Sequence, residues 1–435
     1  MDGGTRRLGI LAGGGGLPRE IADSAAERGI AVSIVAIDGE ADGDFGPHPV
    51  TVVNWGQIGA MVRALKACRA SELIIVGHVH RPELAGLKPD LGFFRYLPNL
   101  IRIVASGGDD SVLRRVVRFF EQRGLRVVGP AEAAPELVVG EGPLGLVRAT
   151  PDHQSDIAKG LAVIRALGAY DIGQGVIVRN GRLLAIEGVE GTDRMIGRVR
   201  GEGAQGRGVL VKRSKPGQDL RVDMPAIGPA TVDGVRAAGL AGIAVEAGGV
   251  LVADRTRTIA RAESLGMFVE GVRDGEGAIS PRRFDSGTAA RSAAKDLQPL
   301  GRVSPRGHAV LDTAKALAAI DALASVVDEA GQAAVVVRNH VLAVEAGGEG
   351  VVTTVERAAG LRQWASLTHR RRGVVGLRTL AHLTPHVVDA AAAAGYAGIA
   401  AAGGLAGGET LASAIAAADK QDVFVLVRRN AGGSA

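Results

Sequence analysis

The stretch Leu8-Gly9-Ile10-Leu11-Ala12-Gly13-Gly14-Gly15-Gly16-Leu17-Pro18 sets the fold class of the N-terminal part of the chain. It begins with an apolar run of strand length, continues through four glycines and opens a helical pattern that runs to about Glu27. Ala31–Ile37 is a second apolar run, and it ends at Asp38. A strand, a glycine loop, a helix and a second strand form a βαβ unit, so we predict an α/β fold that starts with a small parallel sheet.

The glycine loop has two possible roles. Backbone amides at the start of a helix form a site for anions, which makes residues 13–16 candidates for phosphate binding. As a dinucleotide fingerprint, however, Gly13-x-Gly15-x-x-Pro18 has proline where a third glycine should allow close helix packing, so a nicotinamide cofactor is not implied. The alternative is that these residues only form a tight turn between strand and helix.

Two further polar segments follow in the same domain, which we predict to be Rossmann-like and assign to residues 1–132. A predicted strand, Glu72–Val76, leads into Gly77-His78-Val79-His80-Arg81-Pro82. The two histidines could ligate a metal, but no nearby cysteine or HExxH-like partner supports that. An anion-binding loop, with Arg81 as a phosphate fork, or a merely polar surface segment is the better hypothesis. Asp109 and Asp110 precede a predicted helix at 111–123, where capping explains one aspartate better than it explains the pair.

The second domain, residues 133–275, carries two acidic loops. A predicted helix at 152–167 is followed by a hairpin that turns at Asn180-Gly181 and leads into Glu187-Gly188-Val189-Glu190-Gly191-Thr192-Asp193. A strand at 208–212 leads into the second loop, Lys215–Pro229, whose three prolines and two glycines rule out a continuing helix or a central strand. Two acidic loops beside one α/β core predict a divalent cation site or a general base. The candidates are Asp219, Arg221 and Asp223 for catalysis, and Asp223, Asp193 and Glu190 for the metal.

An internal repeat organises the last third of the chain. The stretch 176–187 recurs, one residue shorter, at 335–345, and 229–248 recurs at 385–404. In this alignment Glu187 is kept as Glu345, and Glu190 is matched by Glu349. The acids and the arginine of the second loop are replaced by apolar or uncharged residues, in the pairs Asp219/Val375, Arg221/Leu377 and Asp223/Thr379. We therefore predict a linker at 276–308 and a degenerate, non-catalytic repeat of the catalytic domain at 309–435 that serves packing, dimerisation or regulation.

The overall composition excludes several classes of protein. The 435 residues include one cysteine, Cys68, so no intramolecular disulfide can form, and a cytoplasmic location is expected. The apolar run after Arg7 has the length of a strand, so we do not expect a signal peptide there, and no apolar run reaches the length expected of a membrane span. The net charge of +5 suits anionic small substrates or an anionic membrane surface. A dedicated nucleic-acid reader is disfavoured because no basic stripe with interleaved aromatics is found.

Six motifs in order resemble the LpxI-type UDP-2,3-diacylglucosamine pyrophosphatases of lipid A biosynthesis. They are Leu11–Pro18, Gly77–Pro82, Gly108–Asp110, Asp171–Gln174, Glu187–Asp193 and the long motif Gln218–Pro229. The resemblance covers roughly residues 6–275, and the third domain lies outside it.

The resemblance implies a two-domain α/β hydrolase of a Gram-negative bacterium. It would cleave UDP-2,3-diacylglucosamine to 2,3-diacylglucosamine 1-phosphate (lipid X) and UMP with Mg²⁺ or another divalent cation, and its essential aspartate corresponds to Asp223. Substrate would lie between the two domains. Peripheral contact with the inner membrane and a homodimer are further expectations. The substrate-binding residues expected on this basis are Gly13, Gly14, Gly15, Leu17, Pro18, His80, Arg81, Asp109, Asp110, Gln174, Glu187 and Thr192.

Two other functions compete with this interpretation. The glycine loop and Asp38 are compatible with a Rossmann-type oxidoreductase, which predicts nicotinamide binding, although Pro18 counts against it. The degenerate third domain is compatible with a nucleotide-sugar or lipid-binding protein that binds the UDP-lipid without turnover.

Overall fold

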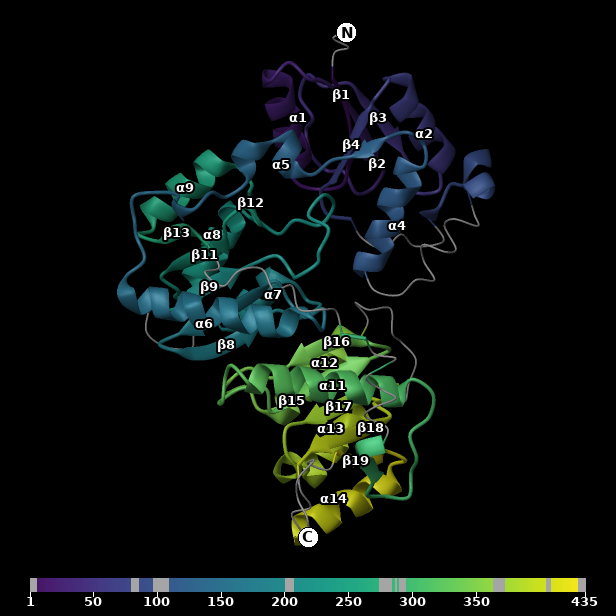
Figure 1. Cartoon of the computed structure of the whole chain (residues 1–435), viewed down its shortest axis with the longest axis vertical. Coiled ribbons are helices and arrows are strands. Elements are labelled where there is room, and N and C mark those ends of the chain that lie inside the picture. The colour runs from purple at the N-terminus through teal and green to yellow at the C-terminus, as the bar shows by residue number, and fades with distance from the viewer. Residues whose placement is uncertain are drawn as a thin grey trace.

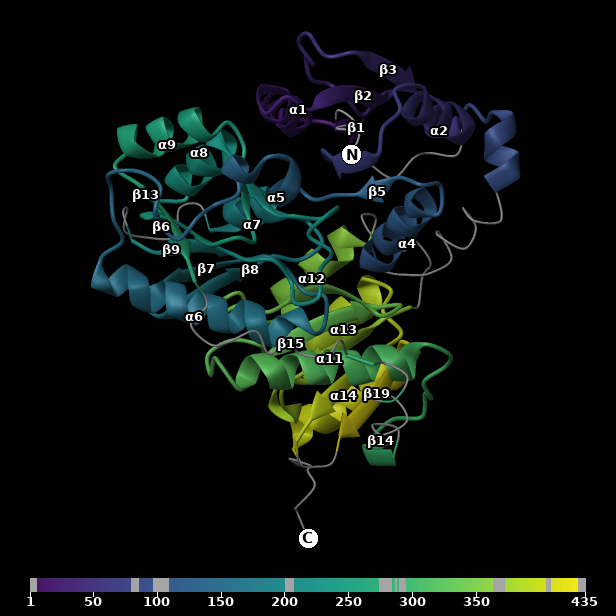
Figure 2. The same ribbon diagram turned by 45° about the horizontal axis from the view of Figure 1, so that its top comes forward.

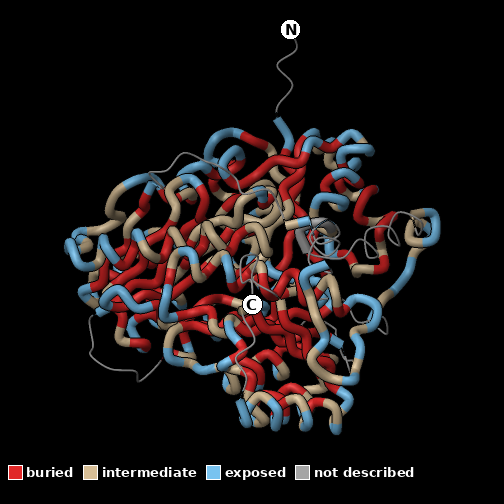
Figure 3. The backbone as a smooth tube through the Cα atoms, turned by 60° about the horizontal axis from the view of Figure 1, so that its bottom comes forward, coloured by how far each residue is buried: buried red, intermediate tan, exposed pale blue. Residues whose placement is uncertain are grey.

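The computed structural model describes residues 6–79, 86–96, 109–199, 207–273, 284–285, 288, 295–362, 372–403 and 408–428. These residues form a mixed α/β fold with three large sheets (Figure 1). We call each sheet with its helices the first, second and third unit, in chain order. The central strands of all three sheets are buried (Figure 3). No helix of the described part of the chain has the length and apolar character needed to cross a membrane.

The first unit is a five-stranded sheet in the order β3-β2-β1-β4-β5, and all its strands are parallel. Apolar clusters cover both of its faces, one under α1 and α5 and the other under α2 and α4. The sequence predicted the βαβ start, and β1, α1 and β2 confirm it. The strands are β1 (Arg7–Ala12), β2 (Ala31–Ile37), β3 (Val50–Val53), β4 (Glu72–Val76) and β5 (Arg126–Val127), and the helices are α1 (Leu17–Glu27), α2 (Ile58–Ala67), α4 (Asp109–Glu121), α5 (Pro130–Ala133) and the short η2 (Pro135–Leu137).

The glycine loop after β1 packs directly against the segment after β4. Gly13 donates its amide to the Val76 carbonyl, and Gly14 exchanges two backbone hydrogen bonds with His78. A Cβ atom on Gly13 would collide with the His78 carbonyl oxygen, so this position has no room for a side chain. The loop therefore holds the carboxyl ends of β1 and β4 together, at the point where the chain order of the parallel sheet reverses.

Gly13→Ala is expected to lower the free energy of unfolding by about 1–3 kcal/mol, because overpacking forces the backbone of either β1 or β4 to shift. The measurement is the melting temperature by calorimetry. Gly16→Ala is the matched control, since Gly16 has right-handed helical dihedrals and its added methyl would meet only the tip of Glu20 at 3.4 Å. Equal melting temperatures for the two variants would contradict the close approach.

The second unit is a six-stranded sheet in the order β6-β13-β11-β9-β7-β8. Its three central strands β13, β11 and β9 are parallel, and the β7–β8 hairpin and β6 are antiparallel to their neighbours. Helix α6 covers one face, and α7, α8 and α9 cover the other. The strands are β6 (Gly142–Pro143), β7 (Gly175–Arg179), β8 (Arg182–Ile186), β9 (Val209–Lys212), β11 (Gly242–Glu246) and β13 (Phe268–Val272), and the helices are α6 (Pro151–Gly168), α7 (Thr192–Arg198), α8 (Pro229–Ala237) and α9 (Arg255–Ser264). A separate two-stranded sheet pairs β10 (Ala226–Ile227) with β12 (Leu251–Val252).

The third unit has the same order of strand directions, β14-β19-β18-β17-β15-β16. Its edge strand β14 falls within the predicted linker at 276–308, which is a correction. Three residues are too few to show a hydrophobic period, and backbone pairing with β19 determines that strand. The strands are β14 (Leu297–Pro299), β15 (Ala333–Val337), β16 (His340–Val344), β17 (Val374–Leu377), β18 (Gly398–Ala402) and β19 (Phe424–Arg428), and the helices are α11 (Ala309–Ala324), α12 (Val351–Leu361), α13 (Pro385–Ala393), α14 (Glu409–Lys420) and the short η3 (Leu380–His382).

The hairpins of the second and third units have the same length, which corrects the predicted alignment. β7 turns into β8 at Asn180-Gly181, β15 turns into β16 at Arg338-Asn339, and all four residues have positive φ. Asp156 of α6 accepts from both amides of the first turn, as Asp312 of α11 does for the second. Asn180 thus corresponds to Arg338 and not to Asn339, because the place in the turn, rather than residue identity, sets the hairpin register.

The predicted pairs Asp219/Val375, Arg221/Leu377 and Asp223/Thr379 are corrected as well. Strand β17 takes the place in the third sheet that β9 takes in the second, so Val375 and Leu377 correspond to Leu210 and Lys212. Arg213 and Arg378, which follow these strands, donate their amides to the backbone carbonyls of Gln174 and Gln332 in the same way. The loop between β17 and α13 is shorter than the loop between β9 and α8, so the third unit lacks most of the second acidic loop.

Candidate active site

The second acidic loop lies between the first and second units. It connects β9 to β10, and its apolar side chains pack into the first unit on both sides of the sheet. Val222 joins the cluster under α2 and α4, whereas Met224 joins the cluster under α1 and α5. Asp223 stands between these two anchors and is half-buried. Its backbone is therefore fixed by hydrophobic contacts on either side.

The loop is also fixed by an aspartate–arginine pair. Asp219 accepts from Arg221 through Nε at 2.8 Å and Nη2 at 2.7 Å, and the Asp219 carbonyl accepts from the amides of Val222 and Asp223. Arg221 also donates from Nη1 to Glu121 at the end of α4, at 3.0 Å. Arg221 thus closes the turn internally and ties it to the first unit. All three guanidinium nitrogens of Arg221 therefore already donate to a carboxylate, either Asp219 or Glu121.

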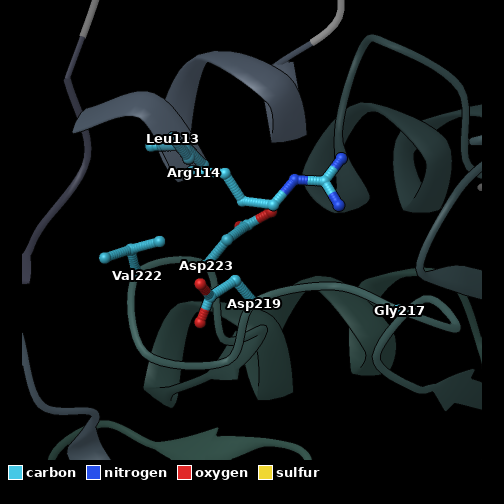
Figure 4. A pocket seen from close by; sticks show the side chains of 6 residues that line it. All are labelled: Leu113, Arg114, Gly217, Asp219, Val222 and Asp223. Atoms are coloured by element: carbon cyan, nitrogen blue, oxygen red, sulfur yellow. The ribbon is translucent and has the colours of Figure 1, made fainter. Parts of the chain in front are cut away.

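A small pocket opens where this loop faces α4 (Figure 4). In Figure 4 the Arg114 side chain extends from α4 alongside the Asp223 carboxylate. The pKa of Asp219 lies below its ordinary value, first because Arg221 donates to it, and Arg114 adds a weaker effect in the same direction. Two carboxylates and one cation therefore share a pocket, and they come from two units. The lining residues are Leu113, Arg114, Gly217, Asp219, Val222 and Asp223.

Arg114 is a pocket residue that the sequence did not single out. It lies in a helix that also carries Arg115 and Arg118, and these arginines look alike in the sequence. Only the packing of the loop against α4 distinguishes Arg114 from the others. No pattern in the sequence could have identified it.

The predicted phosphate-binding amides of the glycine loop are already engaged within the protein. Gly13 and Gly14 donate to backbone carbonyls, and Gly15 donates to the Asp42 carboxylate at 2.8 Å. Pro18, in the first turn of α1, has no amide hydrogen. Phosphate binding by these residues stays a prediction, and in this conformation the three glycine amides point to protein acceptors.

Three other predicted residues, Glu187, Thr192 and Gln174, lie at the carboxyl end of the second sheet, together with Lys212, which was not predicted. Lys212 is buried at the end of β9 and donates to Thr192 Oγ1 at 2.9 Å and to the Ala226 carbonyl at 3.2 Å. Glu187 is buried beside Gly175, and its Oε2 atom has no hydrogen-bond partner. The backbone carbonyl of Gln174 accepts a hydrogen bond from the backbone amide of Arg213. The buried ammonium of Lys212 next to Thr192 was missed, because the sequence shows it only as the last residue of a strand.

The predicted metal set of Asp223, Asp193 and Glu190 is not brought together as a cluster. Within the described ranges, no three His, Cys, Asp or Glu side chains gather at metal-binding spacing. Glu190 is buried, pairs with Arg198 and lies 3.7 Å from Arg357 of the third unit. Its charge is thus already neutralised, which does not support Glu190 as a metal ligand. Asp193 lies in the first turn of α7.

Two pairs of predicted residues complete the survey. His80 and Arg81 lie outside the described residues. Asp109 and Asp110, predicted to precede their helix, are instead the first two residues of α4.

The comparisons with known proteins divide the chain in the same way as the sheets do. The LpxI N-terminal domain family matches residues 7–137, and the LpxI C-terminal domain family matches residues 140–270. The chain belongs to the LpxI family. It is 42% identical over 274 residues to a protein of Caulobacter vibrioides named UDP-2,3-diacylglucosamine pyrophosphatase LpxI, an alignment that covers 61% of this chain and 98% of that relative. The LpxI part comprises the first and second units, and the third unit lies beyond both family matches.

Proposed function

We propose that the chain hydrolyses the pyrophosphate bond of UDP-2,3-diacylglucosamine in lipid A biosynthesis, with Asp223 as the key acid. The observation that carries this proposal is the pocket of Asp219, Asp223 and Arg114 between the first and second units. It lies within the part of the chain that aligns with nearly the full length of the Caulobacter relative, whose name states this activity.

The pocket residues suit attack of water on a phosphorus atom. Asp223 would accept a proton from water or orient it, and the packing of Val222 and Met224 on either side of it supports that role because it holds the backbone of Asp223. Arg114 would neutralise charge that develops on phosphate oxygens, because its guanidinium shares the pocket with Asp223 and is not required for the turn. Arg221 is better described as a positioning residue, since Asp219 and Glu121 already occupy it.

A divalent cation fits this donor set. Asp219 and Asp223 are the two carboxylates of the pocket, and Mg²⁺ in phosphoryl-transfer sites takes one or two carboxylates together with water and substrate phosphates. Asp223 would be the main ligand, because both oxygens of Asp219 accept from Arg221. A bound cation would supply charge neutralisation on the pyrophosphate. Such a site needs only two protein carboxylates, so it is compatible with the finding that no three His, Cys, Asp or Glu side chains gather among the described residues.

The remaining parts of the proposal concern products, location and domains. The products are lipid X and UMP, and the enzyme works in the cytoplasm with peripheral contact to the inner membrane, which its positive charge favours. The first unit is Rossmann-like, and the third is a degenerate repeat of the second. The matching order of strand directions and the equal hairpins support that repeat. A homodimer belongs to the same proposal.

The test is UMP release from UDP-2,3-diacylglucosamine by the full chain, with Mg²⁺ and with a chelator. Release only with Mg²⁺, together with lipid X detected by mass spectrometry, is the expected result. Tight binding of the UDP-lipid without release would favour the binding-protein alternative. Nicotinamide binding in a parallel titration would favour the oxidoreductase, against which the engaged glycine amides count.

A further inference from the structure

The second and third units share one hydrophobic core. Helices α6 and α11, which stand at the same place in their units, pack against each other (Figure 2). The cluster between them joins side chains such as Leu161 and Ile164 of α6 to Ile320 and Leu323 of α11. One side of each unit is therefore buried by the other, through matching elements.

Each unit also contributes the same ion pair to this interface. Glu190 pairs with Arg198, whose Nη2 donates to the Ile186 carbonyl at the end of β8. Glu349 pairs with Arg357, whose Nη2 donates to the Val344 carbonyl at the end of β16. The glutamate precedes α7 or α12 by the same two positions, and the arginine follows it by eight in both units.

These two ion pairs meet across the boundary. Arg357 Nη1 lies 3.7 Å from Glu190 Oε1, and both side chains are largely buried. Burial lowers the pKa of Arg198 to about 10, and the charge of Arg357 also lowers it, whereas Glu349 acts in the opposite direction. Each arginine thus interacts electrostatically with both glutamates, so the four charges form one cluster. A buried charge without these partners would be costly.

Backbone contacts repeat the same reciprocity. A Cβ atom on Gly188, in the segment after β8, would lie 2.7 Å from the Leu342 carbonyl oxygen of β16. A Cβ atom on Gly347, in the segment after β16, would lie 3.1 Å from the Leu183 carbonyl oxygen of β8. The segment that carries Gly188 thus packs closely against the hairpin of the third unit, and the segment that carries Gly347 packs closely against the hairpin of the second unit. Contacts in which one patch meets its own counterpart are the mark of a two-fold, isologous interface.

We propose that the third unit is a tethered substitute for a second copy of the second unit, docked by a two-fold-related interface through α6/α11, the two hairpins and the four-charge cluster. The self-complementary face of the second unit is then closed within each chain. Any homodimer must use another face. This inference concerns docking and does not depend on the activity proposed above.

The test is a cross-link within the full-length chain. Lys159 of α6 and Glu329, which follows α11, form an ion pair across the boundary at 2.8 Å and are both accessible. In a Cys68→Ser background, Lys159→Cys and Glu329→Cys are joined with a short bismaleimide, and a specific protease site inserted between residues 286 and 294 is then cut. The matched control pairs Lys159→Cys with Lys420→Cys at the end of α14, on the far side of the third unit (Figure 1).

We expect one band of full-chain size on a denaturing gel after cutting, and two separate fragments for the control. Separate fragments for the Lys159/Glu329 pair would overturn the docking. A cross-linked species of twice the chain mass would also overturn it, since the third unit would then dock on another chain.

The isologous contact itself is tested by adding methyl groups. Gly188→Ala and Gly347→Ala should each reduce the cross-linking rate several-fold, because the new Cβ atom meets a carbonyl of the other unit. Gly197→Ala is the control, since nothing lies within 4 Å of its Cβ position. Gly347→Ala is the milder variant and suffices if Gly188→Ala fails to fold. Rates equal to the control for both variants would contradict the interface.

Discussion

Replacing Asp223 by alanine is expected to reduce UMP release by about 10³-fold while the UDP-lipid still binds. General acid–base groups contribute on the order of 10²–10⁴ in rate, and the loss of a cation ligand adds to that effect. Val222 and Met224 still anchor the loop in the variant, so the pocket should keep its shape. The measurement is kcat for UMP release, together with the dissociation constant of the UDP-lipid.

Asp233→Ala is the control for that experiment. Asp233 lies on α8, half-exposed, and pairs with Arg261 on the surface. The activity of this variant should equal that of the wild type. If Asp223→Ala retained more than about a tenth of the activity, Asp223 would be neither the base nor the main ligand, and the proposed mechanism would fail.

Replacing Arg114 by methionine is expected to reduce kcat by about 10²-fold, the effect of removing one preorganised donor to transition-state charge. Arg114 is exposed on α4, so its loss should leave the melting temperature nearly unchanged. Methionine keeps the length of the side chain and its helix propensity while removing the charge. The measurement is kcat and KM for UMP release at saturating Mg²⁺.

Arg118→Met is the matched control, one helical turn further along and also exposed. It does not line the pocket and should leave kcat unchanged. An equal fall in kcat for the two variants would mean that the overall positive charge of α4, and not Arg114 in particular, supports catalysis. A rise in KM without a fall in kcat at Arg114 would limit its role to substrate binding.

The sequence determined the elements that depend on local chemistry. The strand–glycine–helix–strand start is confirmed because buried parallel strands are continuous apolar runs. The hairpin at Asn180-Gly181 is confirmed because those residues accept positive φ at little cost. The membership in the LpxI family follows from long motifs, and the comparisons confirm it.

Local chemistry was insufficient where contacts over long sequence separation decide the outcome. The three-residue strand β14 was missed because it exists through its pairing with β19, more than a hundred residues away. The first strand of the repeated hairpin was aligned one residue out of register, because identical letters were matched where the position in the turn decides. The pairs Asp219/Val375 and Arg221/Leu377 were wrong because the third unit has a shorter loop after β17 than the second unit has after β9. Glu190 looked like a metal ligand, and only tertiary packing placed Arg198 and Arg357 around it.

The pocket shows the same division. Asp219, Arg221 and Asp223 could be named from the sequence, because a rigid polar loop in an apolar chain is a visible anomaly. Arg114 could not, since only the docking of that loop on α4 singles out one arginine of a basic helix. Sequence alone determined the local elements and the acidic loop, because these depend on residues close together in the chain. Only the tertiary structure decided which side chains meet at the boundaries between units, because no local pattern encodes a contact between distant segments.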